Sequence, residues 1–262
     1  MPYEVKKEVE PQFKLLLIAT VVSILLWVAS WYLPLVGYLF YPLQLFATFV
    51  HEGGHVLATI VSGNSVQSLT VSPDTSGAVW SQGSGWFSQL FIASAGYVGT
   101  TTFGALLLAW MRYGLSSRHA LYFCSGFIAV MTVVFGLFAP VFSFFSTVTL
   151  GSVAFTLFSG AVLAAALFAV AHWAEIKWAN FALAFLAVQV LLNAVFSLVD
   201  LFFISTFTTA HSDAANMAAA TGIPAVVWVF IWMLISIGLI SVGLRLYAVR
   251  KLGTKNDTVF ED

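Results

Sequence analysis

The stretch FVHEGGHVLATIVSG, residues 49–63, places two histidines and a glutamate inside an otherwise apolar segment. His51 and His55 are four residues apart, so on a helix both imidazoles leave the same face about one turn apart. Glu52 follows His51 directly and is rotated from it by about 100°. Such a group raises two questions, namely what environment encloses it and what it binds.

The environment follows from the composition of the chain. Of its 262 residues, 60% are hydrophobic and only 8% are charged, whereas soluble domains carry roughly 25% charged residues. Apolar runs of about 20 residues, the length of helix that spans a bilayer core of about 30 Å, recur along the sequence. We therefore predict an all-α polytopic membrane protein with about seven hydrophobic helices, six or seven of them spanning, in residues 15–36, 41–62, 87–111, 119–139, 150–172, 178–204 and 224–247.

The segment between the second and third runs has a different composition. NSVQSLTVSPDTSGAVWSQGSG, residues 64–85, contains two strand-like pieces separated by the turn residues Pro73, Asp74 and Gly77. It predicts a short β-hairpin at the membrane surface, directly after the HEGGH helix. We treat residues 1–262 as a single membrane-embedded domain and expect mobile tails at residues 1–12 and 252–262. The single cysteine, Cys124, lies in an apolar run and is expected to be a small core residue.

The basic residues bear on the orientation in the membrane. If every run crosses, one side carries those that follow the third, fifth and seventh runs, namely Arg112, Arg118, Lys177, Arg245, Arg250, Lys251 and Lys255. The positive-inside rule would make that side cytoplasmic. The amino terminus would then lie outside, although it carries Lys6, Lys7 and Lys14. Alternatively one run is re-entrant, and the sequence leaves both arrangements open. The net charge of −1 gives no reason to expect nucleic-acid binding.

The spacing of the HEGGH residues is typical of a metal site. Two imidazoles one turn apart suit two ligands of a tetrahedral zinc ion, each at about 2.0–2.1 Å. The rotation of Glu52 lets its carboxylate reach a water on the metal rather than the metal itself. A carboxylate so placed can take a proton from that water and deliver it to a leaving amine, which is the chemistry of H-E-x-x-H metalloproteases. A structural polar cluster is the alternative, and it would still need partners for three polar groups.

A catalytic zinc ion takes a third protein ligand and leaves its fourth position to water. In QVLLNAVFSLVDLFF, residues 189–203, the polar residues Gln189, Asn193, Ser197 and Asp200 recur at spacings of four, four and three. They form one polar stripe on an apolar helix, and such a stripe in a membrane faces inward. We predict Asp200 as the third ligand, with Asn193 and Ser197 binding substrate or supporting that ligand. A polar seam between helices without metal is the alternative.

Other residues rank below Asp200 as ligands. Asp213 is the second choice, because a loop residue could fold back over the site, but its surroundings, HSDAAN, also read as an ordinary helix cap. His119 and His172 lie at run ends beside charged residues and are expected at the membrane interface, and His211 lies in a polar loop.

These motifs together resemble the site-2 protease family of intramembrane zinc metallopeptidases. The stretches FVHEGGHVLATIVSG, SPDTSGAVW, ASAGYVGTTTFGALLL and SDAANMAAATGIP are similar to its compact bacterial group, the peptidase M50B-like proteins, over about residues 45–230. The resemblance implies a helical core in a bacterial cell membrane, Zn²⁺ held by His51, His55 and Asp200, and Glu52 as the catalytic acid/base. The family usually carries its third ligand in an Asn…Pro…Leu-Asp-Gly stretch, whereas NAVFSLVDLFF lacks that proline and glycine.

The leading hypothesis is an intramembrane zinc metalloprotease that hydrolyses peptide bonds of membrane proteins or peptides within the lipid bilayer. One alternative is a non-catalytic membrane protein with a structural metal site. Another is a small solute or metal carrier, with Glu52 and Asp200 on an ion path. The lack of paired half-repeats counts against a carrier.

Overall fold

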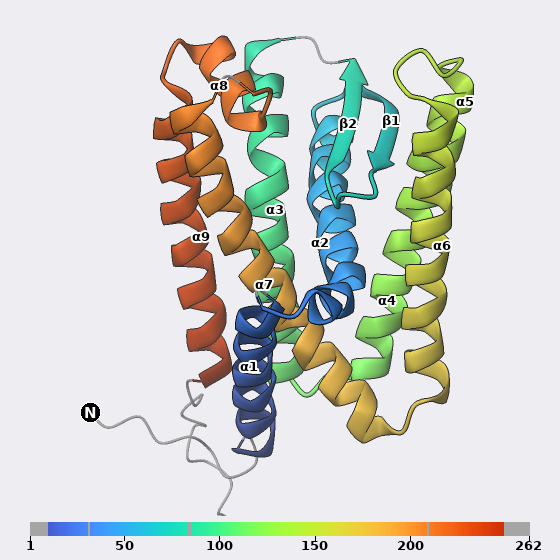
Figure 1. Cartoon of the computed structure of the whole chain (residues 1–262), viewed down its shortest axis with the longest axis vertical. Helices are drawn as coiled ribbons and strands as arrows, with labels where there is room; N and C mark the ends of the chain where they lie inside the picture. Colours follow the sequence, from blue (N-terminus) through green and yellow to red (C-terminus); the bar gives the residue numbers. More distant parts are fainter. Residues whose placement is uncertain (1–9, 31, 83–84, 209, 249–262) are drawn as a thin grey trace, which may run out of the picture.

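The computed structural model describes residues 10–30, 32–82, 85–208 and 210–248. The described chain is mostly helical, with long helices packed side by side and a two-stranded hairpin near one end (Figure 1). We call this end, where the short helix α8 also lies, the hairpin end. The tails predicted at residues 1–12 and 252–262 fall almost entirely outside the described residues. The helices are α1 (Glu10–Ser30), α2 (Pro34–Val61), α3 (Trp86–Arg112), α4 (Ser117–Val130), the π-helix η1 (Met131–Phe138), α5 (Ala139–Phe142), α6 (Leu150–Trp173), α7 (Ile176–Phe207), α8 (Asp213–Thr221) and α9 (Ala225–Ala248).

Five helices are long and apolar enough to cross a membrane, which makes this a multi-pass membrane protein. They are α3, the continuous helix from α4 through η1 to α5, α6, α7 and α9. Among the described residues this is fewer than the six or seven spans predicted from the sequence, since neither α1 nor α2 belongs to this group.

Helices α1 and α2 follow one another along the height of the bundle. In Figure 1, α1 rises from the end opposite the hairpin to about mid-height, where α2 begins and continues toward the hairpin end. Pro34 lies in the first turn of α2, where its missing N–H costs nothing, and Pro42 lies inside the helix, where it removes a backbone hydrogen bond. Because α2 continues in the direction of α1, the two helices do not form two antiparallel crossings.

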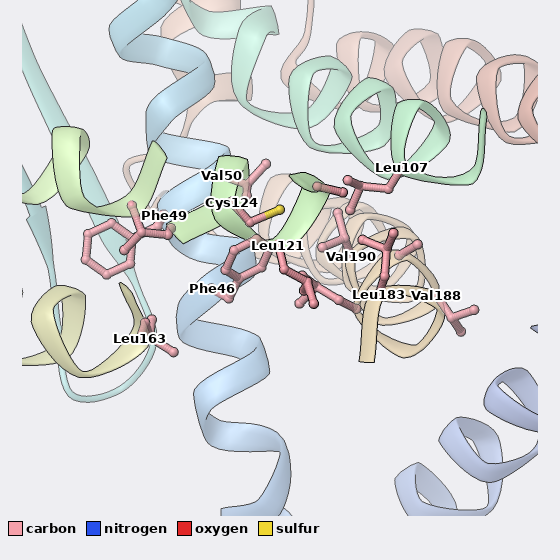
Figure 2. Packing of buried hydrophobic residues seen from close by; sticks show 14 of the residues in the cluster. Phe46, Phe49, Val50, Leu107, Leu121, Cys124, Leu163, Leu183, Val188 and Val190 are labelled. Carbon is pink, nitrogen blue, oxygen red and sulfur yellow. The ribbon is translucent and has the colours of Figure 1, made fainter. Parts of the chain in front are cut away.

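The core lies where α2, α4 and α7 meet (Figure 2). Phe46 and Phe49 of α2, Leu121 and Cys124 of α4 and Leu183 of α7 are each no more than 1% exposed. The prediction that Cys124 is a small core residue is confirmed, because its thiol is free and buried. This packing fixes α2, and with it the HEGGH turn, against the long helix α7.

The predicted hairpin is confirmed. Strand β1 (Ser65–Val71) pairs antiparallel with β2 (Gly77–Gln82), with Val71 opposite Gly77 and Ser65 opposite Gln82. Strand β1 is fixed to α6, because the Val71 N–H donates to Thr156 Oγ1 at 2.9 Å. The sheet has two strands among the described residues, so the second edge of β2 has no strand beside it there.

Candidate metal centre

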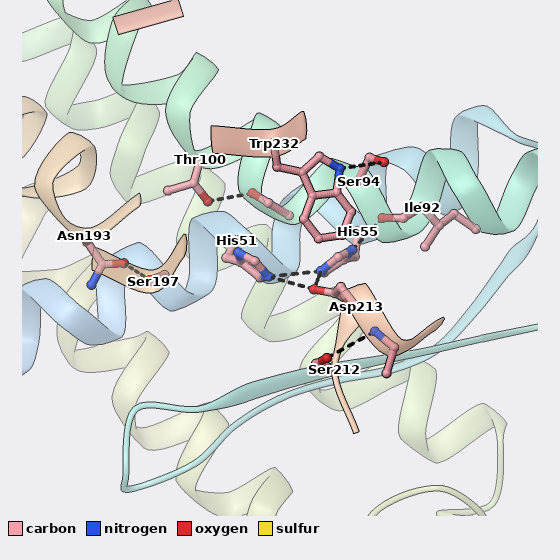
Figure 3. A network of polar contacts seen from close by, with 12 residues as sticks. His51, His55, Ile92, Ser94, Thr100, Asn193, Ser197, Ser212, Asp213 and Trp232 are labelled. Atoms are coloured by element: carbon pink, nitrogen blue, oxygen red, sulfur yellow. Dashed lines mark hydrogen bonds and ion pairs between the residues drawn. The ribbon is translucent and has the colours of Figure 1, made fainter. Parts of the chain in front are cut away.

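His51 and His55 lie on one face of α2 and aim their Nε2 atoms at a common point (Figure 3). The two Nε2 atoms are 3.1 Å apart. On the other side of its ring, His55 Nδ1 lies 2.7 Å from the carbonyl oxygen of Ile92 in α3 and donates to it. This hydrogen bond leaves the lone pair of the neutral imidazole on Nε2, which is the tautomer that ligates a metal.

Asp213 brings a carboxylate to the same point from α8. Its Oδ2 lies 3.4 Å from His51 Nε2 and 3.3 Å from His55 Nε2. Ser212 caps the helix, its Oγ accepting from the Ala215 N–H at 3.2 Å, so Asp213 is the first residue of α8. Burial alone would raise the pKa of Asp213, but without a metal ion the imidazoles can be protonated, and the charge of His55 and the hydrogen bonds from both rings then hold this pKa below its usual range. The side chain is therefore an anionic ligand at neutral pH.

Helix α8 is held over the histidines by a second apolar cluster. Met217 of α8 is buried against Leu198 and Leu201 of α7 and Trp232 of α9, all between 1% and 3% exposed. The Trp232 indole N–H donates to Ser94 Oγ of α3 at 3.1 Å, which ties α9 to the helix behind the site. Asp213 is thus positioned by packing of its helix and not by its own contacts alone.

The three donor atoms fit a zinc ion. Ligand atoms about 2.0–2.1 Å from a tetrahedral centre are about 3.3 Å from one another. The three separations between His51 Nε2, His55 Nε2 and Asp213 Oδ2 are 3.1, 3.3 and 3.4 Å. Two neutral imidazoles and a carboxylate are also donors that zinc accepts, and such a set leaves its fourth position open. Among the described residues this is the one group of three or more possible metal ligands that lie close together.

Close packing around the centre depends on two glycines. A Cβ on Gly96 of α3 would lie 2.4 Å from His51 Nε2 and 2.5 Å from His55 Nε2, so only a glycine lets α3 pass behind the imidazoles. A Cβ on Gly77 of β2 would lie 2.5 Å from Glu52 Oε1. Glu52 is 5% exposed, and its carboxylate therefore lies between α2 and the first residue of β2.

A cavity of about 790 Å³ opens beside the metal centre. His51, Glu52, His55 and Asp213 form part of its wall, and most of β2 forms another part. Asn193 and Ser197 of α7 line it as well, and Ser197 Oγ donates to Asn193 Oδ1 at 3.3 Å. The space is large enough for a stretch of peptide beside the three ligands and Glu52.

The structure does not bring Asp200, the predicted third ligand, into the cluster with His51 and His55, and Asp213, the second choice, lies there instead. Asp200 is exposed and is not part of the cavity wall. Viewed down the axis of α7 and measured from Gln189, Asp200 is rotated by about 20°, Asn193 by about 40° and Ser197 by about 80°. Gln189 faces α1, where its Nε2 donates to Ser23 Oγ at 2.9 Å. Asn193 and Ser197 line the cavity, whereas Asp200, nearer the end of α7, is exposed and lies outside the cavity wall.

His211 and His172 do not belong to the cluster of three possible ligands. His211 is exposed and lines the cavity two residues before Asp213. His172 is exposed at the end of α6, where its Nδ1 lies 3.1 Å from the Tyr122 hydroxyl oxygen.

Comparison with known proteins agrees with this geometry. A family model described as peptidase M50B-like matches residues 16–243. The chain belongs to the peptidase M50B-like family. Membership implies the hydrolase activity of a metallopeptidase, and the cluster of His51, His55 and Asp213 is consistent with the metal that such an activity needs. Searches of curated proteins and of solved structures found no match.

Proposed function

We propose that this member of the peptidase M50B-like family is an intramembrane zinc metalloprotease that cleaves membrane-associated proteins or peptides. His51, His55 and Asp213 hold the zinc ion, and Glu52 is the catalytic acid/base. The observation that supports this most strongly is the set of three donor atoms separated by 3.1–3.4 Å at the wall of a cavity. A structural zinc site is closed by four protein ligands, whereas three ligands beside an open space are typical of a catalytic one.

The chemistry of Glu52 follows from its position next to His51 and beside the cavity. When bound, zinc acts as a Lewis acid on the substrate carbonyl and on water. The Glu52 carboxylate takes a proton from the attacking water as the bond from oxygen to the carbonyl carbon forms. The same group then delivers that proton to the amide nitrogen as the C–N bond breaks, which leaves a carboxylic acid and an amine, and the acid then passes its proton to the amine to give carboxylate and ammonium.

Strand β2 and α7 supply surfaces that can hold the substrate. An α-helical substrate hides its carbonyl groups, so the segment must be extended before water can reach it. Within the part of the chain that the structure describes, one edge of β2 has no strand beside it and most of β2 lines the cavity, so an extended segment can pair with that edge through main-chain hydrogen bonds. The amide of Asn193 and the hydroxyl of Ser197 lie on the α7 side of the same cavity and can bind main-chain groups of that segment.

The test is Glu52→Gln, which keeps the shape of the side chain and removes its ability to carry a proton. We expect it to retain zinc and to lose at least about 100-fold in the cleavage rate of a tagged peptide with one apolar segment, assayed in detergent. Glu175→Gln, at an exposed glutamate near the far end of the bundle, is the matched control and should cleave like the wild type. Cleavage by Glu52→Gln at the wild-type rate would remove Glu52 from the mechanism.

A further inference from the structure

The basic residues of the described chain lie at the end of the bundle opposite the hairpin, which we call the basic end. Arg112 ends α3, Arg118 lies in the first turn of α4, and Lys177 lies in the first turn of α7. Arg245 lies in the last turn of α9, and Lys14 lies in the early part of α1. Figure 1 shows that all of these helix ends lie at the basic end. Within the described residues the hairpin end carries Asp213, and no lysine or arginine lies there.

The sequence alone left a conflict, because seven crossings would separate the amino-terminal lysines from the other basic residues. The course of α1 and α2 removes it. Seven separate crossings would put the start of α1 on the side opposite Arg112 and Lys177. Because α1 and α2 run in the same direction and together extend from the basic end to the hairpin end, α1 starts at the basic end (Figure 1). Lys14 is thus on the same side as the four other described basic residues.

Tryptophans mark both ends of the bundle, as they do at membrane interfaces. At the basic end Trp173 and Trp178 are 73% and 58% exposed. At the hairpin end Trp80 and Trp86 are 54% and 59% exposed, and the Trp86 indole N–H donates to the Ala220 carbonyl at the end of α8. The bilayer therefore lies between these two sets, with its normal along the long helices.

The metal centre lies near the hairpin end of this bilayer. His55 is six residues before the end of α2 at Val61, which corresponds to a depth of about 9 Å along the helix. Asp213 lies in α8, which connects the two spanning helices α7 and α9 at the hairpin end. The site is thus close to the interface that is remote from the basic residues.

We propose that the basic end is cytoplasmic and that the metal centre opens to the non-cytoplasmic face of the membrane. Positive residues near the ends of spanning helices are retained on the cytoplasmic side, and here the structure gathers them at one end. The substrates are then segments of membrane-associated proteins that enter the cavity from the non-cytoplasmic half of the bilayer. This substrate class rests on the proposed protease function, whereas the orientation itself does not.

Cysteine labelling in cells that express the full chain tests the orientation. Cys124→Ser removes the buried native thiol, and Gln82→Cys and Glu175→Cys then place one exposed thiol at the hairpin end and one at the basic end. A membrane-impermeant maleimide added to intact cells should label Gln82→Cys at least about tenfold more than Glu175→Cys. After permeabilisation both should be labelled. Ile223 and Tyr113 are 39% and 67% exposed, and Ile223→Cys and Tyr113→Cys repeat the comparison at the hairpin end and the basic end, respectively.

Labelling of Glu175→Cys but not Gln82→Cys in intact cells would overturn the orientation, and so would equal labelling of both. These outcomes are distinct from failure of the proposed function, because labelling needs no catalysis. The orientation can hold even if Glu52→Gln keeps full activity. Conversely, a labelling pattern that overturns the orientation leaves the role of Glu52 untouched.

Discussion

Substitution of Gly96 by alanine tests whether the metal centre depends on the close approach of α3 to the imidazoles of His51 and His55. The added Cβ would lie 2.4 Å from His51 Nε2 and 2.5 Å from both His51 Cε1 and His55 Nε2. Ordinary contacts of a methyl group with such atoms are at least about 3.4 Å, so the two imidazoles or α3 must move by about 1 Å. Metal ligands tolerate errors of only about 0.2 Å, and we therefore expect the zinc affinity of Gly96→Ala to fall by at least about 100-fold.

Loss of zinc affinity in Gly96→Ala could not be explained by a weaker helix α3. Alanine is a better helix former than glycine by about 1 kcal/mol, so Gly96→Ala should not weaken α3 itself. Gly99→Ala, one turn further along α3, is the matched control, because its Cβ would meet the Gly54 Cα at an ordinary 3.5 Å. Zinc affinity is measured by competition with a chromophoric chelator in detergent, together with the thermal unfolding of each variant. Wild-type affinity in Gly96→Ala would refute the close approach of α3 to the two imidazoles.

Two further substitutions separate the catalytic group from the ligands. Gly77→Ala would bring a Cβ to 2.5 Å from Glu52 Oε1, so we expect kcat to fall at least about tenfold with zinc content unchanged; full activity would show that β2 does not constrain this carboxylate. Ser212→Ala removes the acceptor for the Ala215 N–H and should destabilise the start of α8 by about 1 kcal/mol, which should weaken zinc binding about fivefold. Unchanged zinc affinity in titrations of that variant would mean that Asp213 does not depend on the helix cap.

The local features of this fold could be predicted from the sequence because they depend on neighbouring residues. Apolar runs can only be buried in lipid or protein, and a helix follows from the need to pair every backbone N–H there. The hairpin was predictable from Pro73, Asp74 and Gly77, and the pair of His51 and His55 from the helical repeat alone. None of these inferences needs to know which helix packs against which.

The acid that joins His51 and His55 could not be chosen from the sequence, because it depends on how α7 and α8 pack beside α2. The polar residues from Gln189 to Asp200 point within about 80° of one another on α7, yet Gln189 meets α1, Asn193 and Ser197 line the cavity, and Asp200 is exposed. In the sequence, Asp213 follows a polar stretch in which Ser212 predicts only a helix cap. The packing of Met217 and Trp232 then brings that cap over the histidines, and this packing has no local signal. The direction of α1 relative to α2 escaped prediction for the same reason.

The zinc content of purified Asp213→Ala, measured beside Asp200→Asn and the wild type, tests the central claim most directly. A site formed by His51, His55 and Asp213 predicts about one zinc ion per chain in the wild type and in Asp200→Asn. It predicts loss of zinc from Asp213→Ala after dialysis against a weak chelator, with no change in its helical content. Zinc retained by Asp213→Ala and lost from Asp200→Asn would contradict the account and return the third ligand to α7.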